Sequence, residues 1–206
     1  MTIRFCRLAG AVLAAALLAG CSGSPAAAPS SLPESTRSPT YRCARPDGSS
    51  SPTPCTPQEY QQSREQAALV EEATAVWRRQ FEEDRRLTLA GGVASMTPTP
   101  EIEATMADPG MTLFMDGLKQ VHDAGVTTVK LEYRLTTRWD PTPIHEEALV
   151  TLQGCIDSRG SIFIDRNGKD LGQPSGVILH RWGFKRVDGK LKMTYTSFEK
   201  VAACPF

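Results

Sequence analysis

The spacing of apolar positions from residue 58 to about residue 90 is helical. Apolar or small side chains recur at steps of three, four or seven, at Tyr60, Ala67, Val70, Thr74, Trp77 and Phe81, which predicts one long amphipathic helix. Thr56, Pro57 and Glu59 supply an N-cap, a proline at the first helical position and the acidic member of a capping box. Gly91-Gly92 ends the pattern. The opposite face of this helix carries charges of alternating sign and is expected to be solvated. Its residues are Arg64, Glu65, Glu71, Glu72, Arg78, Arg79, Glu82, Glu83 and Arg85.

Two shorter helices are expected next. Thr99-Pro100 begins one that runs to about Ala107, where the Asp-Pro-Gly run at 108–110 interrupts it. Residues 111–124 form another, which ends at Gly125. This last helix is expected to carry one apolar stripe, made of Leu113, Leu118 and Val121. Three methionines lie in or near this helix: Met106, Met111 and Met115. We interpret them as side chains that fill the core rather than as a metal-binding or ligand-binding group.

Beyond Gly125 the apolar period becomes two, which predicts strands. One strand with a single buried face is expected from an alternation at Val129, Leu131, Tyr133 and Leu135. Residues 146–157 are mostly apolar on both faces and predict a central strand. Residues 162–165 begin another strand before the hairpin signal Asn167-Gly168. Residues 176–187 and 190–201 predict two strands joined at Asp188-Gly189. Helices followed by antiparallel strands predict an α+β fold, with three N-terminal helices on one face of the sheet.

The first 21 residues have the layout of an export signal. Arg4 and Arg7 precede about a dozen apolar residues, too few to cross a ~30 Å hydrocarbon core. The run ends Leu18-Ala19-Gly20-Cys21, which resembles the lipobox of bacterial lipoproteins. That resemblance implies removal of residues 1–20, diacylglycerol on the Cys21 sulfur and a further acyl chain such as palmitate, anchoring the chain at the outer face of the cytoplasmic membrane. The alternative is an ordinary secreted protein that is cut elsewhere.

Residues 21–57 are expected to form a flexible tether, with the folded domain at 58–206. From residue 22 to residue 57 the chain holds eight of the fifteen prolines, with much serine and threonine and almost no large apolar side chain. Such a segment cannot bury enough surface to offset the entropy lost on ordering it. It includes a small loop between two cysteines.

The cysteines predict two disulfides. Removal of the signal takes Cys6, and Cys21 is assigned to lipid, which leaves four. An even number in an exported chain favours disulfides, and four cysteines allow three pairings. We favour Cys43 with Cys55, and Cys155 with Cys204. A zinc site is the sharper alternative, but the chain has no Cys-x-x-Cys spacing.

Composition and charge exclude several classes of protein. The 206 residues carry 23 basic and 23 acidic side chains, and 40% are apolar. This balance argues against a nucleic-acid-binding protein and against disorder throughout. The only long apolar run is N-terminal, which argues against several membrane spans. Without residues 1–20 the chain has a slight acidic excess, so the acyl chains rather than surface charge would hold it on the membrane.

The order of elements resembles the nuclear transport factor 2 superfamily, also called cystatin-like α+β cones. The likeness covers residues 58–206 and rests on the long helix with Trp77 and Phe81, the Pro-Gly break before residue 111 and the run 187–193. The chain is also similar to lipoproteins of high-GC Gram-positive bacteria that contain this cone domain. The resemblance implies a strongly curved antiparallel sheet around the long helix, a conical pocket and frequent homodimers. Members include isomerases and cyclases but also proteins without catalytic activity.

Candidate chemistry is sparse. His180 shares a strand face with Ile178, Trp182 and Phe184 and is the best catalytic candidate, with Asp157 as its partner if the two side chains meet. A structural role for His180 and a turn role for Asp157 are the alternatives. The expected pocket is lined by Trp77, Phe81, Leu131, Tyr133 and Trp182. No metal or cofactor motif is present in the sequence.

The leading hypothesis is a membrane-anchored, non-enzymatic lipoprotein whose cone domain is a binding or assembly module of the cell envelope. Its partner would be an envelope protein or a small apolar ligand. One alternative is a small-molecule isomerase or cyclase that uses His180 and Asp157 for proton transfer. Another is a carrier that holds an apolar ligand in the pocket, which requires a cavity above about 300 Å³.

Overall fold

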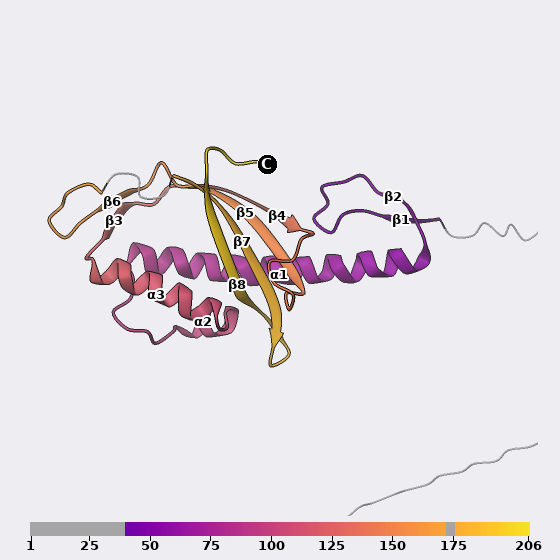
Figure 1. The fold of residues 1–206 in the computed structure, drawn as a ribbon, viewed down its shortest axis with the longest axis horizontal. Coiled ribbons are helices and arrows are strands. Elements are labelled where there is room, and N and C mark those ends of the chain that lie inside the picture. The colour runs from indigo at the N-terminus through magenta and orange to yellow at the C-terminus, as the bar shows by residue number, and fades with distance from the viewer. Residues whose placement is uncertain (1–39, 172–175) are drawn as a thin grey trace, which may run out of the picture. The chain divides into compact units, whose positions relative to one another are not determined.

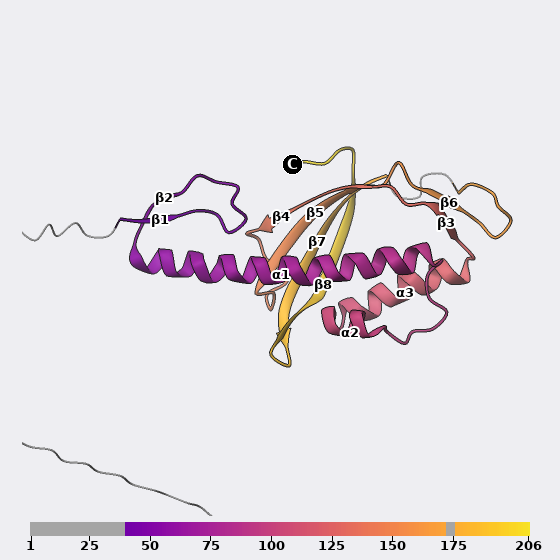
Figure 2. The same cartoon turned by 180° about the vertical axis from the view of Figure 1, so that it is seen from behind.

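A computed structural model of the chain describes residues 40–171 and 176–206 (Figures 1 and 2). The predicted signal at 1–20, the lipidation site Cys21 and the first half of the tether lie outside the described residues. Three helices and three antiparallel sheets make up the described chain, which confirms the α+β class.

Helix α1, Pro57–Leu89, begins and ends where the sequence predicts. The Glu59 backbone N–H donates to Thr56 Oγ1 over 3.2 Å, and the Thr56 N–H donates to Glu59 Oε2 over 2.7 Å, so the capping box is complete. Its buried stripe consists of Val70, Ala73, Trp77, Gln80, Glu83 and Leu87. Glu83 was expected on the solvated face, and this is wrong. Its carboxylate accepts hydrogen bonds from Arg86 and from the Thr99 hydroxyl, both over 2.7 Å. These two donors offset the cost of burying the charge.

Helices α2, Pro100–Thr105, and α3, Gly110–Asp123, form a corner that packs on strand β8. Ala107 N–H donates to the Met193 carbonyl over 3.0 Å. Gly110 lies so close to β8 that a Cβ there would be 2.8 Å from the Thr194 carbonyl oxygen. The predicted stripe on α3 is partly wrong: Leu118 is buried, but Leu113 is 56% exposed and the buried positions are Gly110, Met115 and Leu118.

The main sheet has the antiparallel order β4-β5-β7-β8, with β4 at Arg134–Asp140, β5 at Val150–Asp157, β7 at Val177–Val187 and β8 at Lys190–Val201. As predicted, β5 is a central strand, and Asp188-Gly189 joins β7 to β8. Both turn residues have positive φ, 50° and 76°, the conformation that tight hairpin turns require. In Figure 1 the strands of this sheet cross α1.

The single strand expected at 129–135 is instead two strands in different sheets. Strand β3, Thr127–Lys130, pairs with β6, Ile162–Ile164, and β4 begins only at Arg134. The register shifts between Thr128 and Lys130, and such a shift reverses which side chains face inward. Thr128 is therefore buried and donates its hydroxyl to the Thr88 carbonyl over 3.0 Å, whereas Val129 is 60% exposed. Residues before Val150 form a loop rather than the start of β5.

The end of the expected tether is folded. Strands β1, Tyr41–Cys43, and β2, Thr53–Cys55, form a hairpin closed by the Cys43–Cys55 disulfide. The hairpin packs on α1, where the Tyr41 and Tyr60 rings are 5.2 Å apart and Ser63 Oγ donates to the Ala44 carbonyl over 3.2 Å.

The second predicted disulfide, Cys155–Cys204, is also present and ties β5 to the C-terminal segment. Both predicted pairings are therefore confirmed, and all four cysteines are occupied, so the zinc alternative does not apply to them. Cys155 belongs to a small apolar cluster with Val177 and Leu179. These residues alternate with those of the main core, so the cluster lies on the sheet face that points away from α1.

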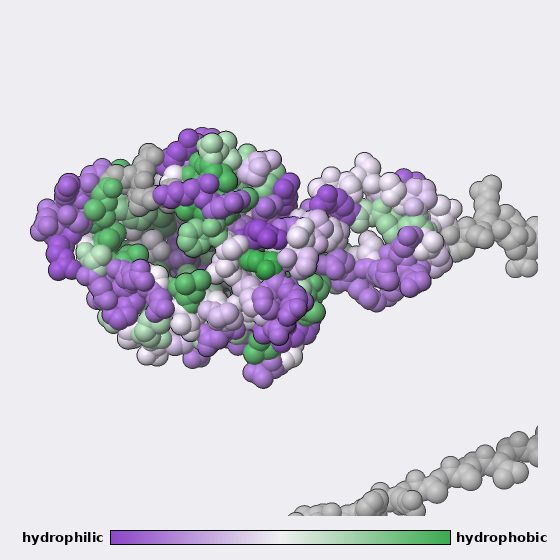
Figure 3. Space-filling model, viewed as in Figure 1, coloured by the Kyte–Doolittle hydropathy of each residue, from purple (hydrophilic) through white to green (hydrophobic). Residues whose placement is uncertain are grey.

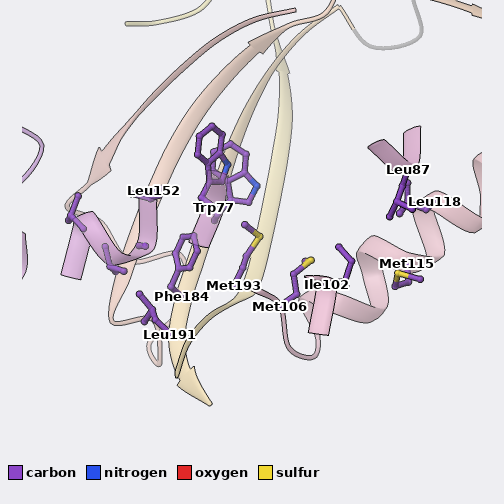
Figure 4. Close-up of a cluster of buried hydrophobic side chains, with 14 residues drawn as sticks. Trp77, Leu87, Ile102, Met106, Met115, Leu118, Leu152, Phe184, Leu191 and Met193 are labelled. Atoms are coloured by element: carbon purple, nitrogen blue, oxygen red, sulfur yellow. The ribbon is translucent and has the colours of Figure 1, made fainter. Parts of the chain in front are cut away.

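The main core lies between α1, the α2–α3 corner and the sheet. Trp77 is at its centre, with ring centroids 5.2 Å from Phe81 and 5.5 Å from Trp182. Figure 4 shows Trp77, Phe184 and Met193 gathered against the strands, and Leu87, Met115 and Leu118 in a second group beside α3. Among the described residues, no helix is long and apolar enough to span a membrane.

We expect the two disulfides to differ in their effect on global stability. Removal of Cys155–Cys204, which are 49 residues apart, by Cys155→Ser with Cys204→Ser should lower the free energy of unfolding by up to about 4 kcal/mol, because the loop it closes is long. Removal of Cys43–Cys55 should cost less than about 1 kcal/mol in global unfolding, because that hairpin contributes no residue to the main core. Urea denaturation of both double variants tests this; equal losses would contradict it.

Candidate functional site

A cavity of about 560 Å³ lies between α1, α3 and the main sheet. Its lining is largely apolar and consists of Gln80, Phe81, Asp84, Thr88, Met106, Leu113, Phe114, Gly117, Leu118, Val121, Ile156, Ile178, His180, Trp182, Met193, Thr196 and Phe198. A smaller chamber of about 170 Å³ adjoins it and shares Phe81, Asp84, Thr88, Ile156, Ile178 and His180. In Figure 3 hydrophobic residues form scattered patches on the main body of the domain, while the β1–β2 hairpin is mainly hydrophilic.

Helical and strand periods together explain which side chains line the cavity. Phe81, Asp84 and Thr88 follow one another at steps of three and four, so they share one face of α1. On the sheet, Ile156 is opposite Ile178, and His180 and Trp182 continue the same face of β7.

Gly154 lets Trp182 lie flat against β5. A Cβ at residue 154 would be 2.5 Å from the Trp182 ring, which is closer than van der Waals contact permits. Glycine at this position leaves room for the indole, which forms part of the cavity wall.

Of the five pocket residues predicted from the sequence, four line these chambers. Phe81 lines both, Trp182 lines the larger, and Leu131 and Tyr133 line the smaller. Trp77 lines neither and is 5% exposed, packed against Phe81 and Trp182 in the core. It supports the wall of the cavity rather than forming it.

His180 lies in the cavity wall, where two aromatic rings contact it. Its ring centroid is 5.4 Å from that of Trp182 and 5.8 Å from that of Phe198. Burial lowers the pKa of His180 to about 4, because a charged imidazolium would lose its hydration there. The side chain is therefore neutral at pH 7.

Asp157, the expected partner of His180, is on the opposite face of the sheet. Side chains alternate along β5, and Ile156 faces the cavity, so Asp157 points away from it. Its carboxylate accepts two hydrogen bonds from the Arg159 guanidinium, over 2.8 and 2.6 Å, which lower the pKa of Asp157 to about 2. The structure does not bring His180 and Asp157 together.

Asp84 is the polar residue of the cavity that the sequence analysis missed. Its carboxylate accepts a hydrogen bond from Thr88 Oγ1 over 3.3 Å, and no Lys or Arg of the described chain forms an ion pair with it. Its neighbours on α1 differ, because Glu82 is paired with Arg85 at 3.9 Å and Glu83 with Arg86 at 2.7 Å. Burial raises the pKa of Asp84 to about 6.

The signal for Asp84 was present in the helical phase of α1. The residue lies within a dense run of charges, residues 82–86, which resembles a solvated surface. However, Asp84 is seven positions after Trp77 and three after Phe81, which places it on the apolar stripe.

A second hollow lies beside residues 64–78 of α1. This hollow, of about 710 Å³ between the β1–β2 hairpin, α1 and β4, is lined by both Arg and acidic residues, including Arg64, Arg78, Arg138, Asp47 and Glu71. It is more polar than the cavity beside α3. Its buried carboxylate, Asp47, lies 3.8 Å from Arg45 and accepts a hydrogen bond from the Ser49 N–H, while Asp47 Oδ2 has no hydrogen-bond partner in the described chain. Within residues 40–171 and 176–206, no group of three or more His, Cys, Asp or Glu side chains could hold a metal ion.

Comparison with known proteins adds little. No family model and no curated protein matches the chain. Among solved structures, it is similar to the crystal structure of the intermembrane space region of chloroplast protein ARC6, with a TM-score of 0.34 and 12% sequence identity. That match covers 66% of this chain and 97% of the other.

Replacement of Asp84 should stabilise the protein in a pH-dependent way. Because the pKa rises from 3.8 to about 6 on folding, the native state binds this proton more tightly, and stability falls as pH rises between those values. Asp84→Asn should therefore raise the free energy of unfolding by about 1–2 kcal/mol at pH 7.5 and leave it unchanged at pH 3.5. Urea denaturation at both pH values measures this.

Asp157→Asn is the matched control. Since the pKa of Asp157 is lowered to about 2, this carboxylate contributes stability above its unfolded pKa and loses it as pH falls toward 2. Its replacement should destabilise the protein at pH 7.5, the opposite sign to Asp84→Asn. A gain for Asp84→Asn that is equally large at pH 3.5 would exclude our explanation.

Proposed function

We propose that this protein is a membrane-anchored, extracytoplasmic binding module that holds an apolar or amphiphilic small molecule in the cavity between α1, α3 and the main sheet. The observation that supports this best is the cavity itself. Its volume of about 560 Å³ lies within the ~300–1,000 Å³ typical of small-molecule sites, and its lining combines many apolar side chains with few polar ones.

The edge of the cavity supports uptake of an apolar molecule. Leu113 on α3 and Phe198 on β8 both line the cavity, yet they are 56% and 67% exposed. Removing the surface of large apolar side chains from water is energetically favourable. A bound ligand that contacts these two residues would cover them.

Binding is favoured over turnover because only one member of the expected catalytic pair, His180, lines the cavity. Proton transfer by His180 and Asp157 requires both side chains at one substrate, and they lie on opposite faces of the sheet. His180 remains available as a neutral hydrogen-bonding group in the wall.

The location is proposed from the N-terminal sequence. The Leu-Ala-Gly-Cys run at 18–21 supports lipidation of Cys21, and the two disulfides are typical of chains that fold outside the cytoplasm. We further propose that the main sheet and α1 form a cone of the nuclear transport factor 2 type, with the cavity at its wide end.

A side chain added at Gly117 should block binding without unfolding the protein. Gly117 lines the cavity from within α3, and a Cβ there meets no atom within 4 Å. Gly117→Trp should therefore abolish fluorescence enhancement of the neutral probe N-phenyl-1-naphthylamine, which the original protein should bind. Helix stability should rise slightly, because glycine is a poor helix former.

The control for Gly117→Trp is Asp116→Trp, which adds the same side chain one residue earlier, outside the cavity lining. This variant should bind the probe as the original protein does. If Gly117→Trp is folded by circular dichroism and binds the probe normally, or if the original protein does not bind it, the cavity is not a ligand site.

Lipid anchoring is tested separately. Cys21→Ala removes the sulfur that would carry the lipid, so the protein should move from the membrane fraction to the soluble exported fraction of a bacterial host. Mass spectrometry of the original protein should show acyl chains on an N-terminal Cys21. An N-terminus elsewhere, without added acyl mass, would contradict the proposal.

A further inference from the structure

We propose that the ligand is a cationic amphiphile, a long-chain or aromatic amine whose apolar part fills the larger chamber and whose ammonium group pairs with Asp84. This inference rests on the proposed binding function and deepens it. It follows from the charges that line the two chambers and from the surroundings of one carboxylate.

Among the described residues, the lining of the larger chamber has a single charged side chain. Asp84 is the only Asp, Glu, Lys or Arg of residues 40–171 and 176–206 that lines it. His180, on the facing strand β7, is uncharged at neutral pH because burial lowers its pKa to about 4. A ligand in this chamber therefore meets one negative charge in an otherwise uncharged and largely apolar wall.

The smaller chamber adds a cation, but one that is already paired. Arg85 contributes to its lining, and Arg85 Nη1 lies 3.9 Å from Glu82 Oε2. Tyr133, from the segment before β4, also faces this chamber, and burial raises the pKa of its hydroxyl above the ordinary value. Tyr133 is thus neutral, and neither residue forms an ion pair with Asp84 in the described chain.

The partly buried Asp84 carboxylate has few hydrogen-bond donors in the described chain. Thr88 Oγ1 supplies one hydrogen bond, 3.3 Å long, and no other hydrogen bond to the carboxylate is made within the described residues. A carboxylate can accept about four, and an unpaired charge next to apolar surface is costly. An ammonium group provides up to three donors and the missing positive charge.

Other head groups fit less well. A fatty carboxylate would bring a second negative charge into the chamber that holds Asp84, and like charges disfavour each other most strongly where water is excluded. An alcohol could donate one hydrogen bond but would leave the carboxylate without a counter-charge. The geometry therefore predicts a preference for amine over alcohol and for alcohol over carboxylate.

The test compares three probes that share one alkyl chain: dodecylamine, dodecanol and dodecanoate. Each is titrated below its micelle concentration against the protein loaded with N-phenyl-1-naphthylamine at pH 7.5. We expect dodecylamine to displace the probe with an apparent Kd at least about tenfold lower than that of dodecanoate. In Asp84→Asn this preference should fall below about threefold, while the affinity for dodecanol changes less than about twofold.

Asp116→Asn is the matched control, since it makes the same chemical change on an exposed residue of α3 outside the cavity lining. It should keep the full preference for dodecylamine. A second readout is pH: the affinity for dodecylamine should decrease as pH falls through about 6, where Asp84 becomes protonated, and Asp84→Asn should lose that dependence.

The outcomes separate this inference from the proposed function. If dodecanol displaces the probe but dodecylamine binds no better than dodecanoate, the cavity binds ligands and the inference is wrong. The inference is also wrong if Asp84→Asn keeps the preference, or if Asp116→Asn loses it equally. If no probe binds the original protein, the proposed function itself fails.

Discussion

The structure depends on the contact between the aromatic stripe of α1 and the face of the main sheet. Trp77 is 5% exposed and lies between Phe81 on its own helix and Trp182 on β7. Aromatic side chains bury more apolar area than any others, so this contact fixes where α1 crosses the sheet. The place of α3 follows, because its corner with α2 packs on β8 beside the same core. The cavity is the space that these three elements leave unfilled.

The Asp84 carboxylate lowers the stability of the folded protein. A wall of Phe, Ile, Leu and Trp side chains would be more stable with a neutral residue at position 84 than with a carboxylate. Elsewhere on the molecule, carboxylates such as Glu83 and Asp157 are paired with arginines at 2.6–2.7 Å. An unpaired acidic group in an apolar pocket is the pattern expected where binding, rather than folding, selects the residue.

Local signals in the sequence were sufficient for most of the fold. The capping box at Thr56 and Glu59, the turn at Asp188-Gly189 and the even count of cysteines each depend on chemistry within a few residues or on simple counting, and each prediction was confirmed. The strand at 129–135 was predicted wrongly because its break depends on the shifted pairing of β3 with β6, which no local period reveals. Asp157 and His180 were both placed on strands correctly, but their faces depend on the register between β5 and β7. The sequence analysis missed Asp84 because its neighbours are charged, although its position in the helical repeat places it on the side of α1 that faces the core.

The most direct test of this account is a crystal structure of the folded domain grown with dodecylamine. We predict an alkyl chain in the cavity in contact with Phe81 and Trp182, and a nitrogen within about 3.2 Å of the Asp84 carboxylate, the range of a charge-assisted hydrogen bond. A cavity filled by the protein's own side chains, with no alkyl chain inside, would contradict the central claim.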